Sequence, residues 1–240
     1  MLRRVSFSVA ILAVCLAAPS YADEPNPRGA LVNGDGPGWV MLDGDDFVRV
    51  NGDDKTLVWN GSLAIGSGKP IGVTRSVKQY KNFELLIEWQ HKEFAGNSGV
   101  FVWVPESALN QLPPDELPNA GIEIQMLDHG YKAKYLRDGG KPPLFFSTNG
   151  DVFAVGESTM TPFEPLSPNG SRSFPSEDRS KGFGSWNHYY VRAINGEVRL
   201  WVNGAEVSGG RDCNPSEGYL CLESEGAPIL FRNIRIRELP

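Results

Sequence analysis

Glycine and proline recur along the whole chain and separate short segments rich in valine, isoleucine and aromatic residues. There are 27 glycines and 18 prolines in 240 residues, and they occur throughout the sequence. This spacing is typical of many short strands joined by turns, and helical periodicity is almost absent. The pattern predicts an all-β fold of two packed antiparallel sheets.

Several strands can be predicted one by one. Residues 83–89, FELLIEW, place every second side chain on one apolar face, and residues 98–104, SGVFVWV, are apolar on both faces. The segments HYYVRAI and EVRLWVNG flank Asn195-Gly196, which is a type I′ hairpin signal. The segment LFRNIRIREL is expected to close the chain as a last strand.

The chain is long enough for one sizeable core, and 40% of its residues are hydrophobic, so we expect a single domain. Residues 1–22 contain two arginines, then an apolar run, then a small-residue stretch, which together describe an export signal. We therefore expect a signal peptide over residues 1–22, a domain over residues 23–240, and a periplasmic or secreted protein. No later stretch approaches about 18 consecutive apolar residues, so no membrane span is expected.

Two cysteines, Cys213 and Cys221, follow the expected signal peptide, in the segment CNPSEGYLC. An oxidising compartment and a turn between them permit a disulfide. The sequence leaves open whether this disulfide forms.

The charge of the chain argues against nucleic acid as a partner. The formal net charge is −6, and no run of basic residues is present. A phosphate backbone therefore has no electrostatic reason to bind.

Two stretches are too long for hairpin turns: residues 105–120, with four prolines, and residues 156–184, rich in serine, proline and glycine. Long loops inside a compact domain are usually functional or mobile. Because both flank residues 121–130 in sequence, we expect them to form walls or a lid over whatever that segment presents. A surface insertion is the alternative.

Residues 121–130, GIEIQMLDHG, interrupt an apolar strand with acceptor side chains. On a regular strand, Glu123 and Gln125 share a face about 6.6 Å apart, while their neighbours point into the core. Asp128 is out of phase and joins that face only if a bulge intervenes or the strand has ended. Together with His129, this segment is richer in proton-transfer groups than a solvated strand requires.

Five blocks occur in order, within a match that runs from about residue 39 to residue 240: KQYKNFELLIEWQ, GNSGVFVWV, GIEIQMLD, SWNHYYVRAINGEVRLWVNG and GYLCLESEGAPILFRNIRIREL. Together they resemble the 3-keto-disaccharide hydrolase family, also described as 3-keto-glucoside 1,2-lyase and 3-keto-2-hydroxyglucal hydratase domains. The resemblance implies a concanavalin-like jelly-roll β-sandwich that acts on sugars whose C3 hydroxyl has been oxidised to a ketone. The expected partner is a saccharide.

This chemistry needs few groups. A ketone at C3 acidifies the C2 proton, so a base can remove it, and the resulting enolate expels the glycosidic oxygen from C1. Water then adds back. Glu123 is the candidate base, Gln125 and Asn97 are candidate hydrogen-bond partners for the substrate, and His129 or Asp128 is a possible acid.

Other candidate residues have a structural alternative. Trp103 could be a platform for a sugar ring or part of the core. His188 is a candidate substrate-binding residue or a histidine on a strand face, and Asn97 could instead form the turn before a buried strand. Arg232 and Asn233 are expected to tie the last strand to a neighbouring strand.

A metal site cannot be assembled from the sequence, because only three histidines are present and no convincing set with carboxylates emerges. The sequence leaves open whether a metal ion is bound, and it identifies no cofactor. The acidic clusters at residues 43–46 and 51–54 do not follow an EF-hand pattern, and we expect them to be solvated turns.

Two other functions are alternatives to an enzyme that cleaves 3-keto-glycosides by elimination. The first is a carbohydrate-binding module without catalysis, which would present a shallow aromatic strip where an enzyme has a deep concave pocket. The second is a β-glucanase. Laminarinase-type glucanases, similar in fold class, display a nucleophile Glu, a central Asp and an acid/base Glu on one strand. Here Gln125 replaces the central Asp, and a second carboxylate beside Glu123 would be needed.

Overall fold

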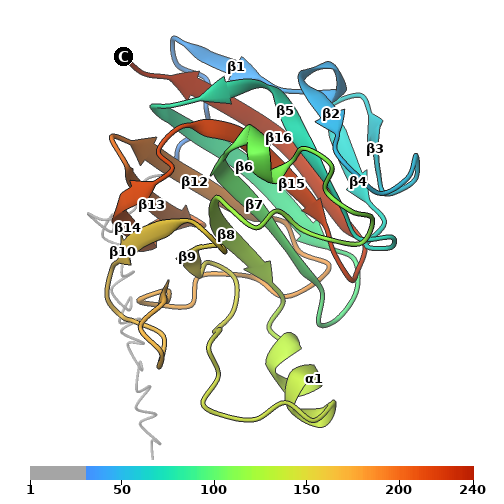
Figure 1. The fold of residues 1–240 in the computed structure, drawn as a ribbon, viewed down its shortest axis with the longest axis vertical. Coiled ribbons are helices and arrows are strands. Elements are labelled where there is room, and N and C mark those ends of the chain that lie inside the picture. The colour runs from blue at the N-terminus through green and yellow to red at the C-terminus, as the bar shows by residue number, and fades with distance from the viewer. Residues whose placement is uncertain (1–30) are drawn as a thin grey trace, which may run out of the picture.

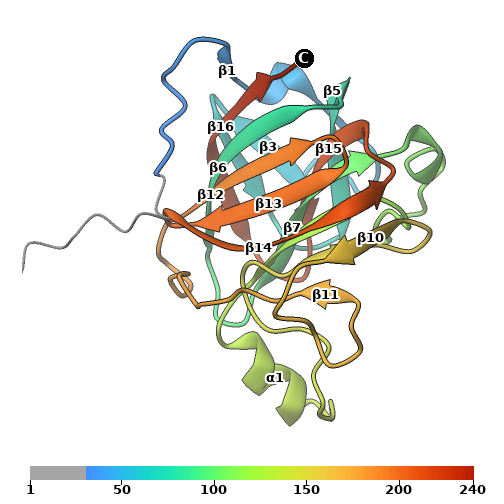
Figure 2. The same cartoon turned by 90° about the vertical axis from the view of Figure 1, so that its left-hand side faces the viewer.

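The computed structural model describes residues 31–240 as two stacked layers of β-sheet (Figures 1 and 2). The expected signal peptide lies outside the described residues. The strands are β1 (Trp39–Met41), β2 (Phe47–Arg49), β3 (Leu57–Asn60), β4 (Leu63–Gly66), β5 (Gly72–Tyr80), β6 (Phe83–His91), β7 (Asn97–Val104), β8 (Ile122–Leu127), β9 (Val152–Ala154), β10 (Thr159–Pro162), β11 (Arg172–Ser173), β12 (Asn187–Ile194), β13 (Glu197–Val202), β14 (Ala205–Asn214), β15 (Gly218–Ser224) and β16 (Ile229–Glu238). One α-helix, α1 (Tyr131–Arg137), and two 3₁₀ turns (Gly44–Asp46 and Glu106–Ala108) complete the described secondary structure.

The strands form one nine-stranded and one seven-stranded sheet. The order in the first is β10-β14-β13-β12-β6-β16-β4-β3, with β1 paired to β16. The order in the second is β11-β9-β8-β7-β15-β5-β2. All pairings are antiparallel, so the expected all-β jelly-roll sandwich is confirmed.

The main core lies between the two sheets. Strand β6 contributes Phe83, Leu85, Ile87 and Trp89 to it, as the alternation predicts. The facing sheet contributes apolar side chains from β7, β8 and β15, among them Val100 and Ile124. Burial of these apolar surfaces is the dominant stabilising contribution.

The predicted hairpin joins β12 and β13 through Asn195 and Gly196, whose φ angles of 51° and 73° are those of a type I′ turn. Arg232 and Asn233 on β16 both hydrogen-bond to Glu88 on β6, the neighbouring strand. Both predictions are therefore confirmed.

A second apolar cluster lies on the outward face of the seven-stranded sheet. Phe101, Cys221 and Tyr219 pack there against the loop of residues 105–120, through Leu109 and its neighbours. This loop therefore covers part of the outward face, close to where β8 begins.

The acidic clusters are local turns. Asp43 caps the 3₁₀ turn at Gly44–Asp46 by accepting a hydrogen bond from the backbone N–H of Asp45. Asp53 accepts hydrogen bonds from Lys55 N–H and from the hydroxyl of Thr56. Within residues 31–240, no helix has the length and apolar character needed to span a membrane.

No disulfide joins Cys213 and Cys221, and both are free thiols. Cys213 lies on β14 and belongs to the core between the sheets, whereas Cys221 lies on β15 and belongs to the outward cluster. The turn between them leads from one sheet to the other, so the two side chains point into different clusters. The short spacing of the two cysteines in the sequence permitted a disulfide, but it did not reveal that their side chains lie in different clusters.

We predict that both thiols are unreactive in the folded protein. Burial raises the pKa of Cys213 to about 12 and raises the pKa of Cys221 as well, so neither forms the reactive thiolate near neutral pH. Titration with a thiol reagent, followed by peptide mass mapping, should label both residues after denaturation and neither before it. A linked Cys213–Cys221 peptide under non-reducing conditions would contradict this structure.

Candidate active site

The side chains of strand β8 alternate between the core and the outward face of the sheet. Ile122, Ile124 and Met126 are fully buried between the sheets, and Glu123 and Gln125 lie on the opposite face. On the paired strand β7, Phe101 lies opposite Glu123 and Gly99 lies opposite Gln125. The outward face is therefore where the predicted acceptor side chains gather.

Gly99 leaves room for two carboxyl groups. A Cβ atom at this position would lie 3.1 Å from Glu123 Oε1 and 3.0 Å from Glu223 Oε2. Glu123 comes from β8 and Glu223 from β15, the strands on either side of β7. The missing side chain of Gly99 thus lets carboxyl groups from two flanking strands converge over the strand between them.

Glu223 is fully buried, and neither of its carboxyl oxygens has a hydrogen-bond partner among the described residues. Burial raises its pKa well above the ordinary value, and the neighbouring Glu123 and Glu225 carboxyls raise it further. Burial of an ionised carboxylate without a hydrogen-bond partner or a counter-ion carries a large free-energy cost. Glu223 therefore stays protonated.

Glu123 is the carboxyl group that can ionise near neutral pH. Burial and the charge of Glu225 raise its pKa from 4.5 to about 8, while the guanidinium of Arg172 opposes the rise. Because Glu123 has this cation nearby and Glu223 does not, the two carboxyls are unequal. One remains an acid while the other titrates, as in catalytic carboxyl pairs.

A chain of hydrogen bonds crosses the site. Arg172 donates to Gln125 Oε1 over 3.1 Å, Gln125 donates to Asn97 Oδ1 over 2.9 Å, and Asn97 donates to Glu225 Oε2. Burial raises the pKa of Glu225, and the hydrogen bond from Asn97 opposes this. Each amide is thereby held in one orientation.

Arg172, on β11, is fixed from two sides. Its guanidinium lies 3.5 Å from the ring centre of Phe153 and 3.7 Å from Asp151 Oδ2. Asp151 is fully buried and accepts a hydrogen bond from Ser147 N–H, and burial raises its pKa to about 6. This support lets Arg172 keep its charge beside the glutamates.

These side chains line a groove of about 350 Å³, which we call the acidic groove. Its lining comprises Asn97, Leu117, Glu123, Gln125, Phe153, Ala154, Val155, Gly156, Arg172 and Glu225. Leu117 comes from the loop of residues 105–120, and Gly156 and Arg172 come from residues 156–184. Both long loops therefore contribute walls, as expected from the sequence.

The expected acids lie outside the acidic groove. Asp128 is buried and accepts hydrogen bonds from the backbone N–H groups of Ala95, Gly130 and Phe183, so its carboxylate organises the surrounding loops. His129 is exposed, with its Nε2 2.7 Å from the hydroxyl of Ser180. Neither lines the groove.

Trp103 and His188 also lie outside the acidic groove. The ring of Trp103 is fully buried in the core and donates a hydrogen bond to the carbonyl of Lys81, so it has no exposed face for a sugar. His188 lies on β12 in the nine-stranded sheet, with Nε2 2.9 Å from the carbonyl oxygen of Val32. Of the expected substrate-binding residues, the acidic groove contains Asn97 and Gln125.

Sequence reasoning missed Glu223, Glu225 and Arg172. The first two lie in LCLESEG, where acidic and other residues alternate as in GIEIQML. That alternation is a usable signal, because both segments place acceptors on one face of a strand. Arg172 lies in a polar stretch of sequence without periodicity, and no local pattern predicts its role.

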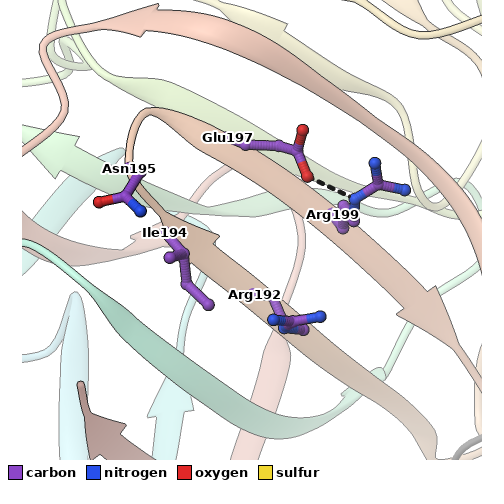
Figure 3. A pocket seen from close by; sticks show the side chains of 5 residues that line it. All are labelled: Arg192, Ile194, Asn195, Glu197 and Arg199. Atoms are coloured by element: carbon purple, nitrogen blue, oxygen red, sulfur yellow. Dashed lines mark hydrogen bonds and ion pairs between the residues drawn. The ribbon is translucent and has the colours of Figure 1, made fainter. Parts of the chain in front are cut away.

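Two further hollows lie on the nine-stranded sheet. The one at the β12–β13 hairpin holds about 300 Å³ and is lined by Arg192, Ile194, Asn195, Glu197 and Arg199 (Figure 3). Its Arg199 forms ion pairs with Glu197 and with Glu206. The other, of about 640 Å³, contains Trp186, whose ring is covered on one face by the guanidinium of Arg232.

Within residues 31–240, no group of three or more His, Cys, Asp or Glu side chains has an arrangement that could hold a metal ion. Glu123 and Glu223 converge at Gly99, and Glu225 is a third acidic neighbour of both.

The fold and the acidic groove define a jelly-roll protein with a cluster of buried acids on the outward face of one sheet. Residues 28–237 match the family described as 3-keto-alpha-glucoside-1,2-lyase-like domain. The chain therefore belongs to this family, as the sequence resemblance predicted. Membership supports a carbohydrate-active protein. No functionally curated protein matches the sequence.

Solved structures share the fold at low sequence identity. Two candidate glycosyl hydrolases from Parabacteroides distasonis superpose with TM-scores of 0.61 and 0.57, at 22% and 20% identity. The first comparison covers 85% of this chain and 94% of the other, and the second covers 84% and 99%. A carbohydrate-binding module from Bacillus subtilis gives a TM-score of 0.53 at 14% identity, covering 80% and 96%. At these identities the likeness concerns the fold.

We predict that folding stability falls as the pH rises from about 4.5 to about 8. The pKa of Glu123 is about 8 in the folded protein against an ordinary 4.5, so the folded state keeps a proton that the unfolded state releases. This contribution is complete below the unfolded pKa and is lost as the pH rises through the folded pKa. Denaturant unfolding at about pH 5 and about pH 8 measures it. The Glu123→Gln variant, which cannot ionise, should lose less stability between the two, and an equal loss in both proteins would refute the assignment.

Proposed function

We propose that this protein cleaves 3-keto-glycosides by elimination followed by hydration, with Glu123 as the base. The observation that carries the proposal is the buried Glu123 carboxyl in the acidic groove, with a pKa raised to about 8 and the Arg172 guanidinium nearby. A general base works best when its pKa lies close to the operating pH. Glu123 meets that condition.

In the proposed reaction, the Glu123 carboxylate takes the C2 proton, and the electrons of the C–H bond enter the enolate of the C3 ketone. Arg172 is positioned to stabilise the negative charge, since its guanidinium lines the same groove. The C1–O bond then breaks, and its electron pair leaves with the aglycone oxygen. Glu225 also lines the groove and has a raised pKa, so it can give that oxygen a proton. Asn97 and Gln125 are the proposed substrate-orienting amides.

A conventional glycosidase is the second candidate, because Glu225 supplies the additional carboxyl group in the groove of Glu123. Retaining hydrolysis needs one carboxylate that is ionised and another that is held protonated. Here the pKa values of Glu123, Glu223 and Glu225 are all raised, which disfavours a nucleophile that is ionised before it attacks. The groove and its carboxyls also differ from the shallow aromatic strip expected of a non-catalytic carbohydrate-binding module.

We further propose export to the periplasm or the medium, on the pattern of residues 1–22 alone. N-terminal sequencing of protein isolated from its native compartment would give a start near Asp23 if this is right, and Met1 if it is wrong.

We predict that Glu123→Gln abolishes turnover of a 3-keto-glucoside while largely preserving binding. The amide keeps the shape of the side chain and loses its basicity, and removal of a general base costs about 10² to 10⁴ in rate. Release of the aglycone measures turnover, and titration calorimetry measures binding. Hydration in deuterated water should place deuterium at C2 of the product.

The alternatives give different results in the same assays. Hydrolysis of an unmodified glucoside at a comparable rate, without deuterium at C2, would support the glycosidase. Binding of a saccharide with no turnover of either substrate would support a binding module. Full activity of Glu123→Gln would remove Glu123 from the role of base.

On the proposed mechanism, kcat/KM rises with pH as Glu123 loses its proton. We predict that Arg172→Leu moves this rise to higher pH. The guanidinium lowers the pKa of Glu123, so its loss leaves Glu123 protonated to a higher pH. The matched control is Arg172→Lys, which keeps the charge and should keep the rise closer to its wild-type position. A rise that is unchanged in Arg172→Leu would show that Glu123 is not the group that titrates.

A further inference from the structure

A second, smaller cavity adjoins the acidic groove and differs from it in character. It holds about 160 Å³ and shares three lining residues with the groove, namely Asn97, Gln125 and Arg172. The rest of its wall is formed by Leu127, Tyr131, Tyr135, Phe145 and Phe146. We call it the aromatic pocket. It is polar where it meets the acidic groove and mainly aromatic elsewhere.

The rings of the aromatic pocket are arranged around one buried anchor. Phe146 is 5% exposed, and its ring centre lies 5.6 Å from that of Tyr131, 5.1 Å from that of Tyr135 and 5.3 Å from that of Phe145. All three contacts are close to perpendicular, which is a favourable geometry for aromatic pairs. The wall is therefore held in place before any ligand binds.

Helix α1, which follows β8 beyond the end of the strands (Figure 1), supplies two of these rings. Tyr131 and Tyr135 are four residues apart, so they lie on one face of the helix. Phe145 comes from the connection to β9, and its ring centre is 5.2 Å from the guanidinium carbon of Arg172. Arg172 thus lies at the boundary between the pocket and the groove.

The size and polarity of the pocket fit a single flat ring. An engineered protein cavity of about 150 Å³ binds benzene. A second sugar would require partners for several hydroxyl groups, whereas the lining beyond the edge shared with the groove offers polar side-chain groups only on Tyr131 and Tyr135. An aromatic ring needs no such partners, and it gains from edge-on contact with the surrounding rings.

We propose that the aromatic pocket is the leaving-group subsite and that the preferred substrates are 3-keto-glycosides with a single-ring aryl aglycone. The chemistry of this proposal rests on the proposed function, whereas the ligand class rests on the pocket. When Glu123 removes the C2 proton and the C1–O bond breaks, the electron pair passes to a phenolic oxygen. A phenol has a pKa of about 10, so this oxygen leaves more readily than that of a sugar alcohol.

Binding tests the subsite independently of turnover. The probes are unmodified phenyl glucoside and methyl glucoside of the same anomer, with affinities measured by calorimetry. We expect the phenyl compound to bind at least about tenfold more tightly, because a buried ring removes a large apolar surface from water. Equal affinities would overturn the proposal.

Variants locate the effect. Tyr135→Ala should reduce the phenyl-to-methyl preference about tenfold, in affinity and in kcat/KM for the corresponding 3-keto-glucosides. Phe145→Ala, at a residue that is 45% exposed, provides a second variant that does not disturb the core. The matched control is Phe183→Ala, because Phe183 is an exposed aromatic residue that lines neither cavity. An unchanged preference in both pocket variants would overturn the subsite.

The two proposals fail in different ways. Turnover of methyl 3-keto-glucoside without a phenyl preference in binding would leave the proposed function intact and remove the subsite. A phenyl preference that Tyr135→Ala abolishes, with no turnover of any 3-keto-glycoside, would support the subsite and remove the proposed function. A lower KM for a 3-keto-disaccharide than for phenyl 3-keto-glucoside would contradict the aryl preference.

Discussion

Two buried carboxyl groups from different strands meet over Gly99, and the rest of the site follows from this constraint. Glu223 has no hydrogen-bond partner among the described residues, so it must keep its proton. Its neighbour Glu123 can ionise because Arg172 lies nearby. Arg172 in turn needs Asp151 and the ring of Phe153 to hold it in place. A side chain at position 99 would disturb both carboxyls, which explains the glycine on a strand that is otherwise well packed.

The sandwich separates stability from chemistry by the two-residue period of its strands. Inward-facing side chains of β7, β8 and β15 form an apolar core with β6, while the outward-facing side chains of the same strands carry the acids. An unpartnered buried carboxyl such as that of Glu223 costs roughly 1–3 kcal/mol. The large apolar core can offset this cost, and functional sites are where such costs are tolerated. The outward loops then reduce access of water to the acids without being part of the main core.

The sequence predicted the fold because each strand carries its own evidence in alternation and in turn residues. Glu123 and Gln125 were predictable for the same reason, and Asn97 lies on the adjacent strand in the chain. Glu223 and Glu225 were missed because β15 is distant in sequence, and only the sheet order brings it beside β7. Trp103 could not be assigned, since a strand that is apolar on both faces does not indicate which face meets solvent. Cys213 and Cys221 are close in sequence but belong to different sheets.

On the proposed chemistry, one carboxyl of raised pKa serves both halves of the reaction. Elimination requires a base that accepts the C2 proton, and hydration of the resulting enone requires an acid that returns a proton to C2 when water adds at C1. A carboxyl with a pKa of about 8 is populated in both forms near neutral pH, so Glu123 can perform both transfers. The nucleophile of a retaining glycosidase has a different requirement, because it must already be ionised in the free enzyme to attack C1. The burial that makes Glu123 a poor nucleophile is therefore what suits it to reversible proton transfer.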